Sequence, residues 1–318
     1  MKPAHIFFNL KDKHRTFFLI FTAFVCFFLP QRIFATPLTV NDVSGRTIDV
    51  DKPFTRIISL YSAHTENICS LSGEKLLIGI SRSDNYPPSI SQKQRFSYRE
   101  DPEKFIGARP DLVLVRPMIE RSYPEFIKTL QKTGITVVSL QPTSIDTMLV
   151  YWQKLGILTG KKKQAEKMIS DFKSRLTMVR KRVAATPISK RPRVYFESMH
   201  KKMKTFAPTS IGIFVLTEAG GVNVASQARQ VRKTNIANFG KERLLARGDE
   251  IDIFLAQHGR MNPVTKEIIL NEPGFSAIKA IRNKRIYIID ETLVSRPTLR
   301  IIDGIEQLNR LFYQQETH

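Results

Sequence analysis

Polar side chains suited to binding an anionic group stand directly after the predicted strands of this 318-residue chain. Arginine offers a planar fork of N–H donors that matches a carboxylate, catecholate or phosphate group, and tyrosine adds a flat amphipathic ring. The candidate contacts at these strand ends are Tyr61, His64, Arg82, Tyr86, Arg116, His200, His258, Arg260 and Arg296. We expect Arg116 to contribute most, because it follows the most clearly buried strand. Solvent exposure, or a link between two parts of the fold, is the alternative role for each arginine.

The three histidines among these candidates raise the alternative of direct metal capture, since imidazole is a common metal ligand. No carboxylate stands at a matching position to complete a set of ligands. A histidine in such a loop more often forms ordinary hydrogen bonds. We therefore expect neither a resident metal nor another cofactor.

Motifs for catalysis are missing from the sequence. There is no nucleophile elbow, no glycine-rich phosphate loop and no HExxH pair, and Gly220-Gly221 lies in AGGVN, which does not fit GxGxxG. An enzyme of the two-domain α/β type would need a dinucleotide fingerprint or cysteines for a cluster, and the chain has only 2 Cys. We therefore expect a binding protein and not an enzyme.

Short apolar strands that alternate with helices position the candidate residues, a pattern typical of right-handed crossovers and parallel sheets. The first alternating unit runs from a strand at Arg56 to Leu60 to a strand at Ile135 to Leu140. A second unit begins with a strand at Arg193 and ends in a helix from Thr298 to Tyr313. Between the two units, apolar residues at steps of three and four predict one long helix from Lys161 to about Ala185.

These elements predict the fold class and the division of the chain. We expect an α/β protein with two lobes, whose mainly parallel sheets are joined by a long connecting helix. The expected parts are a signal peptide at 1–35, an N-terminal lobe at 36–143, a connecting helical region at 144–186 and a C-terminal lobe at 187–318. Ligands of open α/β sheets lie beyond the carboxyl ends of the strands, so two lobes are expected to place two such edges around one cleft.

The first 35 residues have the pattern of a targeting segment. Basic residues precede an uncharged apolar run from Phe17 to Leu29, and the small Ala35 follows at a plausible cleavage point. The run is short for a bilayer span, but the residues before Ala35 do not form a clean small-x-small pattern, so a retained membrane anchor is the alternative. Cys26 follows the bulky Val25 inside the apolar run, which is not typical of a lipoprotein. We expect an exported, periplasmic protein, anchored to the membrane if the leader is not cleaved.

The chain carries 50 Lys+Arg against 29 Asp+Glu, a formal net charge of +21. Removal of residues 1–35 would take away five basic residues and one acid, which leaves 21 − 4 = +17. Such a charge favours nucleic acid, an anionic membrane surface or an acidic small ligand as a partner. The basic residues are scattered and no nucleic-acid-binding motif accompanies them, so we expect no nucleic-acid partner. A nonspecific binder of the envelope surface, driven by charge, is a further alternative.

Six segments, in their order and spacing, resemble the substrate-binding proteins of ABC importers for ferric siderophores, cobalamin and haem, the class III type with a helical backbone. The segments cover almost all of the chain after the leader. They are Arg56 to Ser81, Asp101 to Pro117, Thr133 to Ile145, Glu218 to Ala225, Phe239 to Ala256 and Arg285 to Glu291. The resemblance implies two lobes, a rigid connecting helix, and a permease of the inner membrane with its cytoplasmic ATPase as partners. We expect the protein itself to be a monomer.

The resemblance leaves three solutes open. The stretch SDNYPPSI (Ser83 to Ile90) resembles the corresponding loop of cobalamin-binding members, and Thr143 to Ile145 also resembles them. Those members tend to pack indole rings on the corrin, whereas the only Trp here, Trp152, stands on a predicted helix. Because the basic balance favours an acidic ligand, we expect capture of a ferric siderophore or a similar iron chelate for delivery to the permease. Cobalamin is the second candidate and haem the third.

The same family places one acidic residue on each lobe to engage arginines of the permease. Glu66 and Glu242 fall at the two matching positions of this sequence. The resemblance therefore implies that both carboxylates dock the loaded protein onto the permease. A carboxylate in the first turn of a helix also stabilises the helix dipole, which is the structural alternative.

Overall fold

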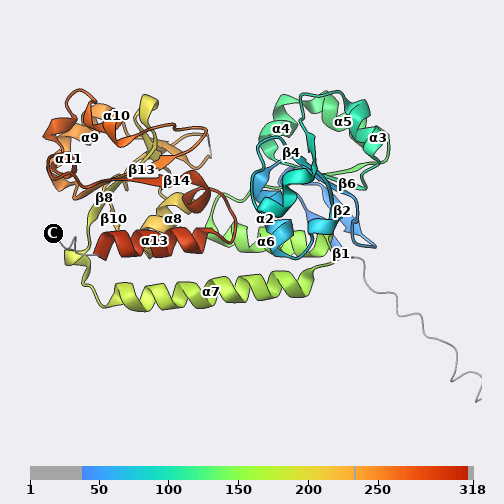
Figure 1. Cartoon of the computed structure of the whole chain (residues 1–318), viewed down its shortest axis with the longest axis horizontal. Helices are drawn as coiled ribbons and strands as arrows, with labels where there is room; N and C mark the ends of the chain where they lie inside the picture. Colours follow the sequence, from blue (N-terminus) through green and yellow to red (C-terminus); the bar gives the residue numbers. More distant parts are fainter. Residues whose placement is uncertain (1–37, 233, 314–318) are drawn as a thin grey trace, which may run out of the picture. The chain divides into compact units, whose positions relative to one another are not determined.

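The computed structural model describes residues 38–313 apart from Lys233. The expected signal peptide at 1–35 lies outside the described residues. The described residues belong to one compact unit of the chain, and they form two large sheets with helices around each, together with a two-stranded hairpin (Figure 1). No helix among residues 38–313, Lys233 aside, is both long and apolar enough to cross a membrane.

The first lobe contains a five-stranded, fully parallel sheet in the order β5-β4-β3-β6-β7. Its strands are β3 (Ile57–Ser59), β4 (Leu77–Ser81), β5 (Gln94–Phe96), β6 (Leu112–Val115) and β7 (Thr136–Ser139). The hairpin of β1 (Leu38–Asn41) and β2 (Thr47–Val50) precedes this sheet. The helices between its strands are α2 (Ser62–Ser70), α3 (Pro102–Ala108), α4 (Pro117–Ser122) and α5 (Pro124–Lys132).

The uninterrupted apolar run from Leu112 to Val115 forms strand β6, and all four side chains are buried. Leu112 and Leu114 belong to one hydrophobic cluster, whereas Val113 and Val115 belong to another. Side chains alternate between the two faces of a strand, so both faces of this sheet are covered. The carboxyl end of β6 is therefore the edge at which polar residues can meet.

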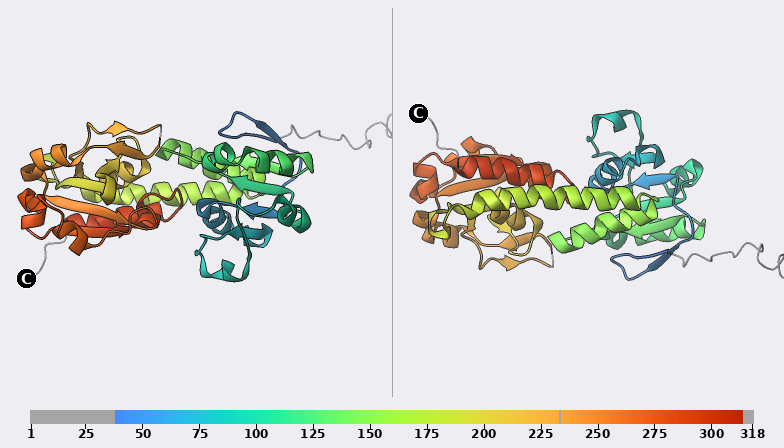
Figure 2. Two further views of the ribbon diagram at one scale, coloured as in Figure 1. Left: turned by 90° about the horizontal axis from the view of Figure 1, so that it is seen from above. Right: turned by 90° about the horizontal axis from the view of Figure 1, so that it is seen from below.

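Two successive helices, α6 (Ile145–Leu158) and α7 (Lys162–Ala184), connect the lobes. The Ser144 side chain caps α6 in a capping box with Thr147, and Gly160 turns the chain between the helices with a φ of +68°. Helix α7 has 23 residues and is therefore about 35 Å long. It packs on α6 and also on α8 (Ile211–Glu218) and α13 (Ile301–Tyr313) of the second lobe (Figures 1 and 2). The edge-on contact of Trp152 with Phe172, 5.5 Å between ring centroids, holds α6 against α7.

The second sheet is mixed and has the order β11-β12-β9-β8-β13-β14, with β10 paired to β8. Its parallel members are β8 (Arg193–Met199), β10 (Val222–Asn223), β13 (Ile253–His258) and β14 (Ile286–Asp290). Its antiparallel members are β9 (Lys204–Phe206), β12 (Ile236–Asn238) and β11 (Arg229–Gln230). The antiparallel part arises because a tight turn with Met203 at a φ of +45° folds the chain back after β8 without a crossover helix. Short helices α9 (Lys241–Ala246), α10 (Lys266–Leu270), α11 (Lys279–Arg282) and α12 (Glu291–Val294) complete this lobe.

The expected α/β class, with two sheet-containing lobes and a long helix between them, is confirmed. The sheet of the first lobe is entirely parallel, whereas the sheet of the second carries three antiparallel strands beyond the parallel core. In both lobes the parallel strands end at one edge of the sheet, and the polar residues that follow these strands are the candidates for the functional site.

Candidate functional site

Tyr61 and Arg116 meet at the carboxyl edge of the first sheet. Tyr61 directly precedes α2 and Arg116 directly precedes α4, after the neighbouring parallel strands β3 and β6. The Arg116 guanidinium lies over the Tyr61 ring, 5.2 Å from its centroid. Both residues are half-buried, so a donor fork and an aromatic face stand together where a solute could contact them.

A segment that follows α12 brings second-lobe residues to the same place. The backbone oxygen of Pro297 accepts hydrogen bonds from Asn67 Nδ2 at 2.9 Å and from the Trp152 indole at 3.4 Å. These two contacts anchor the segment on α2 and α6. They place Arg296 on one side of the anchored proline and Thr298 on the other.

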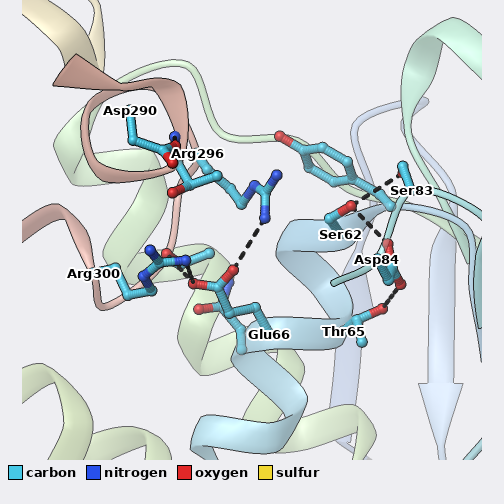
Figure 3. Close-up of polar contacts among 12 residues, drawn as sticks. Ser62, Thr65, Glu66, Ser83, Asp84, Asp290, Arg296 and Arg300 are labelled. Carbon is cyan, nitrogen blue, oxygen red and sulfur yellow. Dashed lines mark hydrogen bonds and ion pairs between the residues drawn. The ribbon is translucent and has the colours of Figure 1, made fainter. Parts of the chain in front are cut away.

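The carboxylate of Glu66 contacts the polar side chains of this segment (Figure 3). Thr298 Oγ1 donates to it at 2.9 Å, Arg296 Nη1 lies at 3.3 Å, and Arg300 Nη1 lies at 3.7 Å. Glu66 itself is 2% exposed. Burial raises the pKa of the Glu66 carboxyl, and the charges of Arg296 and Arg300 and the Thr298 hydrogen bond oppose that rise.

Arg300 also reaches the loop that follows β4. Its guanidinium lies over the Tyr86 ring, 4.4 Å from the centroid, and Tyr86 is 41% exposed. Glu66 and Tyr86 therefore contact two arginines of the segment after α12, while Tyr61 contacts Arg116 after β6. We call the group Tyr61, Tyr86, Arg116, Arg296 and Arg300 the arginine–tyrosine cluster.

Asp84 holds the loop that carries Tyr86. Its carboxylate is buried and accepts hydrogen bonds from Ser62 Oγ at 2.6 Å and Thr65 Oγ1 at 2.5 Å (Figure 3). It also accepts one from Ser81 Oγ at 2.6 Å. These hydroxyls replace the water that a buried carboxylate would lose. The network ties the loop to α2, so Tyr86 and Tyr61 are positioned by the same helix.

Tyr61 keeps its proton at neutral pH. Burial raises the pKa of the Tyr61 hydroxyl; the charges of Arg116 and Arg296 lower it, while those of Glu291 and Glu66 raise it further. The cluster therefore offers the phenolic O–H of Tyr61, the hydroxyl of Tyr86 and three guanidinium groups. Such a set of donors suits the anionic oxygens of a carboxylate, hydroxamate or catecholate.

His64 lies beneath this edge and not on it. Its ring is fully buried, with Nδ1 2.7 Å from the Tyr151 hydroxyl and Nε2 3.0 Å from the Val115 oxygen. Because a backbone oxygen only accepts, Nε2 must carry the proton and Nδ1 must accept from Tyr151. Burial lowers the pKa of His64 to about 4, so the ring is neutral. Contact of His64 with a solute, as expected from the sequence, would require both hydrogen bonds to break.

Four other predicted contacts do not join the cluster. Arg82 is exposed and forms an ion pair with Glu100. His200 is 5% exposed and its Nδ1 lies 2.9 Å from Glu197 Oε2; the hydrogen bond to Glu197 raises the pKa of His200, against the effect of burial. His258 is exposed, with Nδ1 3.0 Å from the Val264 oxygen, and Arg260 is exposed beside it. A solute role for these residues stays a prediction.

The two residues implied in permease docking differ in exposure. Glu242 is exposed in the first turn of α9. The Glu66 carboxylate is buried against its second-lobe partners, so a permease arginine would have to displace Arg296 and Arg300. Docking through Glu66 stays a prediction, and it requires that Arg296 and Arg300 first leave the carboxylate.

The sequence-based prediction missed Arg300 and Asp84. Arg300 stands four residues after Arg296 in RPTLR, and this repeat of arginines beyond the last strand was the available signal. Among residues 38–313 without Lys233, no cluster of three or more His, Cys, Asp or Glu residues could hold a metal ion. Within the described residues, the candidate site therefore offers hydrogen-bond donors for an anionic group and not a set of metal ligands.

Comparison with known proteins gives a consistent match along the chain. Residues 57–293 match the model of a family described as periplasmic binding protein. An uncharacterized ABC transporter substrate-binding lipoprotein, YvrC of Bacillus subtilis, is 23% identical over 286 residues, 89% of this chain and 88% of the relative. The vitamin B12-binding protein of Vibrio cholerae is 24% identical over 262 residues, 81% of this chain and 89% of the relative.

A solved structure shares the fold. The crystal structure of a possible iron-binding, periplasmic solute-binding protein from Staphylococcus epidermidis superposes with a TM-score of 0.72 at 27% identity. It covers 83% of this chain and 100% of the other. Because the superposition covers most of this chain and the whole of the other, the overall fold described above recurs in another protein.

Proposed function

Because the chain belongs to the family of periplasmic binding proteins, in the class III type with a helical backbone, we propose that it delivers an anionic ferric chelate to an ABC importer. A ferric siderophore is the first candidate. The arginine–tyrosine cluster is the observation that carries this proposal. Proteins of this family bind solutes and hand them on unchanged, and the proposal assigns no catalytic step to the chain.

The charge of the cluster supports an anionic solute. It contains three guanidinium groups, and the buried Glu66 carboxylate faces two of them. A solute with several anionic oxygens would complete the charge balance, because each guanidinium can still donate to a second acceptor. The half-buried ring of Tyr61 and the more exposed ring of Tyr86 would contact the organic part of such a chelate.

Cobalamin is the second candidate. The Vibrio cholerae relative is named as a vitamin B12-binding protein, and the loop SDNYPPSI resembles those of cobalamin-binding members. Trp152, however, is completely buried and donates to the Pro297 oxygen, so no indole is available to pack on a corrin ring. The cluster of arginines also favours an anion over the nearly neutral corrin face, and haem remains the third candidate.

Location and partners follow from the same family membership. We propose that residues 1–35 act as a leader that exports the protein to the periplasm, where a permease with its ATPase receives the solute. Glu242 would dock one lobe, since it is exposed. Glu66 would dock the other only after its arginine partners release it.

A panel of solutes tests the proposal. The purified protein would be titrated with anionic ferric siderophores, cobalamin and haem, with fluorescence quenching as the readout. We expect the tightest binding for an anionic ferric chelate. Arg116→Ala should weaken that binding by about tenfold or more, because a hydrogen bond to a charged group contributes about 1.5 to 3 kcal/mol.

The matched control is Arg121→Ala. Arg121 is exposed in the last turn of α4 and Arg116 directly precedes the same helix, so both changes remove one guanidinium close in sequence. The control should bind like the unchanged protein. Tighter binding of cobalamin or haem than of every anionic chelate, or equal affinities in the two variants, would contradict the choice of solute.

A further inference from the structure

The outer face of α7 is strongly basic. The helix contains eight Lys or Arg residues and two acids, an excess of 8 − 2 = +6. Its buried residues recur at steps of three and four and pack against the other helices, so the basic residues project away from the core. The excess is therefore a property of the surface.

Only part of this charge is neutralised by nearby acids. Lys167 pairs with Asp171 at 2.7 Å, Arg175 with Asp303 and Glu306, and Arg180 with Glu218. The other basic residues of α7 have no ion pair within the described part of the chain. They are Lys162, Lys163, Lys173, Lys181 and Arg182, and all are exposed.

Exposed apolar side chains stand among the unpaired charges at the end of the helix. Met178 is 58% exposed, and it lies three and four residues before Lys181 and Arg182, on the same face at about 100° per residue. Ile188 is 72% exposed in the turn after the helix, two residues before the exposed Lys190.

This turn is held against α7. Arg191 Nε donates to the Thr186 oxygen at 3.1 Å, and its Nη2 donates to the Val183 oxygen at 3.2 Å. The two bonds fix the turn at the last residues of the helix. We call the group Met178, Lys181, Arg182, Ile188 and Lys190 the α7 end surface.

We propose that the α7 end surface binds an anionic phospholipid bilayer. Lysine and arginine are attracted to anionic headgroups, and large apolar side chains enter the boundary between headgroups and acyl chains. A purely electrostatic partner such as a nucleic acid would not account for two large apolar side chains held in solvent among the charges. The site uses no residue of the arginine–tyrosine cluster and so goes beyond the proposed function.

Vesicle co-sedimentation tests this proposal. The full chain would be mixed with vesicles of phosphatidylcholine, with or without added phosphatidylglycerol. Every variant carries residues 1–37, so these contribute equally, and pure phosphatidylcholine measures binding that does not depend on lipid charge. We expect binding to the anionic vesicles and a steep loss between about 0.1 M and about 1 M salt, where the Debye length falls from about 10 Å to about 3 Å.

Charge reversal provides the decisive comparison. Lys181→Glu with Arg182→Glu should weaken binding to anionic vesicles by about tenfold or more, because each basic residue near the surface adds to the attraction and each glutamate opposes it. Arg121→Glu with Lys132→Glu is the matched control, since it also reverses one arginine and one lysine, both exposed, in the last turns of α4 and α5. Met178→Ser with Ile188→Ser should remove the binding that survives at high salt.

The outcomes separate cleanly. Equal losses in the two charge-reversal variants would show that net charge alone drives association, and they would overturn the proposal. Absence of binding to phosphatidylglycerol vesicles, or binding to nucleic acid in its place, would overturn it as well. Circular dichroism on each variant shows whether the fold is kept, and single changes at Lys181 or Met178 repeat the comparison if a double variant does not fold.

Discussion

Protonation of His64 should destabilise the protein in acid. The ring is completely buried, both of its nitrogens have partners, and burial lowers its pKa from 6.5 to about 4. The unfolded chain therefore binds the proton more readily than the folded one as the pH falls through this window. By linkage, the contribution of a group with a depressed pKa is present above pH 6.5 and is lost as the pH approaches 4.

The size of the effect follows from the two pKa values. Between about pH 7.5 and about pH 4.5 the free energy of unfolding should fall by about 2.5 kcal/mol through this histidine, at about 1.4 kcal/mol for each pKa unit. Urea unfolding at the two pH values measures the fall. Glutamine cannot titrate, so the free energy of unfolding of His64→Gln should fall by about 2.5 kcal/mol less than that of the unchanged protein between the same two pH values. This difference does not depend on the stability of the variant at neutral pH.

His258→Gln is the control, because His258 is exposed and its ring Nδ1 donates to one backbone oxygen, that of Val264. It measures how the removal of an exposed histidine affects the same urea unfolding experiment. The proton resonances of the His64 ring give a second measurement on the unchanged chain and should titrate near pH 4. An ordinary midpoint near 6.5, or equal pH dependence in all three proteins, would refute the reasoning.

Two further predictions concern docking and packing. Glu242→Gln should reduce solute uptake by cells without changing solute affinity, whereas Glu103→Gln, an exposed first-turn glutamate of α3, should change neither; full uptake with Glu242→Gln would remove the docking assignment. Gly304→Ala should destabilise the protein by about 2 kcal/mol or more, because a Cβ there would lie 2.1 Å from the backbone oxygen of Leu293. Gly107→Ala in α3 meets nothing within 4 Å and should be neutral or stabilising by up to about 1 kcal/mol, so thermal unfolding of the pair tests the packing of α12 on α13.

The parallel core of both lobes could be predicted from the sequence, because its longer strands contain apolar runs. Examples are Leu112 to Val115 in β6 and Ile253 to Ala256 in β13, both covered on both faces. The long helix could be predicted for a similar reason, since its apolar residues recur at steps of three and four. Strands β9 and β12 could not, because each has three residues and owes its place to pairing with β8 and β9 and not to a pattern of its own.

The candidate site was only partly accessible from sequence. Tyr61 and Arg116 follow neighbouring parallel strands, so their meeting could be expected from topology. The ion pair of Glu66 with Arg296 joins residues 230 positions apart, and no local pattern encodes such a contact. His64 shows the opposite limit, since a histidine after a strand has the same sequence signal whether its ring faces solvent or is held beneath the edge by Tyr151 and Val115.

The Pro297 anchor bears on how the chain reaches its final state. Asn67 donates to the backbone oxygen of Pro297, which is 230 residues later in the chain, and Glu66 accepts from Thr298, which is 232 residues later. A nascent N-terminal half would therefore display an unpaired Glu66 carboxylate, and an Asn67 amide with only its bond to the Tyr151 hydroxyl, until the last stretch emerged from a ribosome or a secretion channel. A chain arrested before residue 297 would lack both contacts and should be the form that proteases and chaperones recognise.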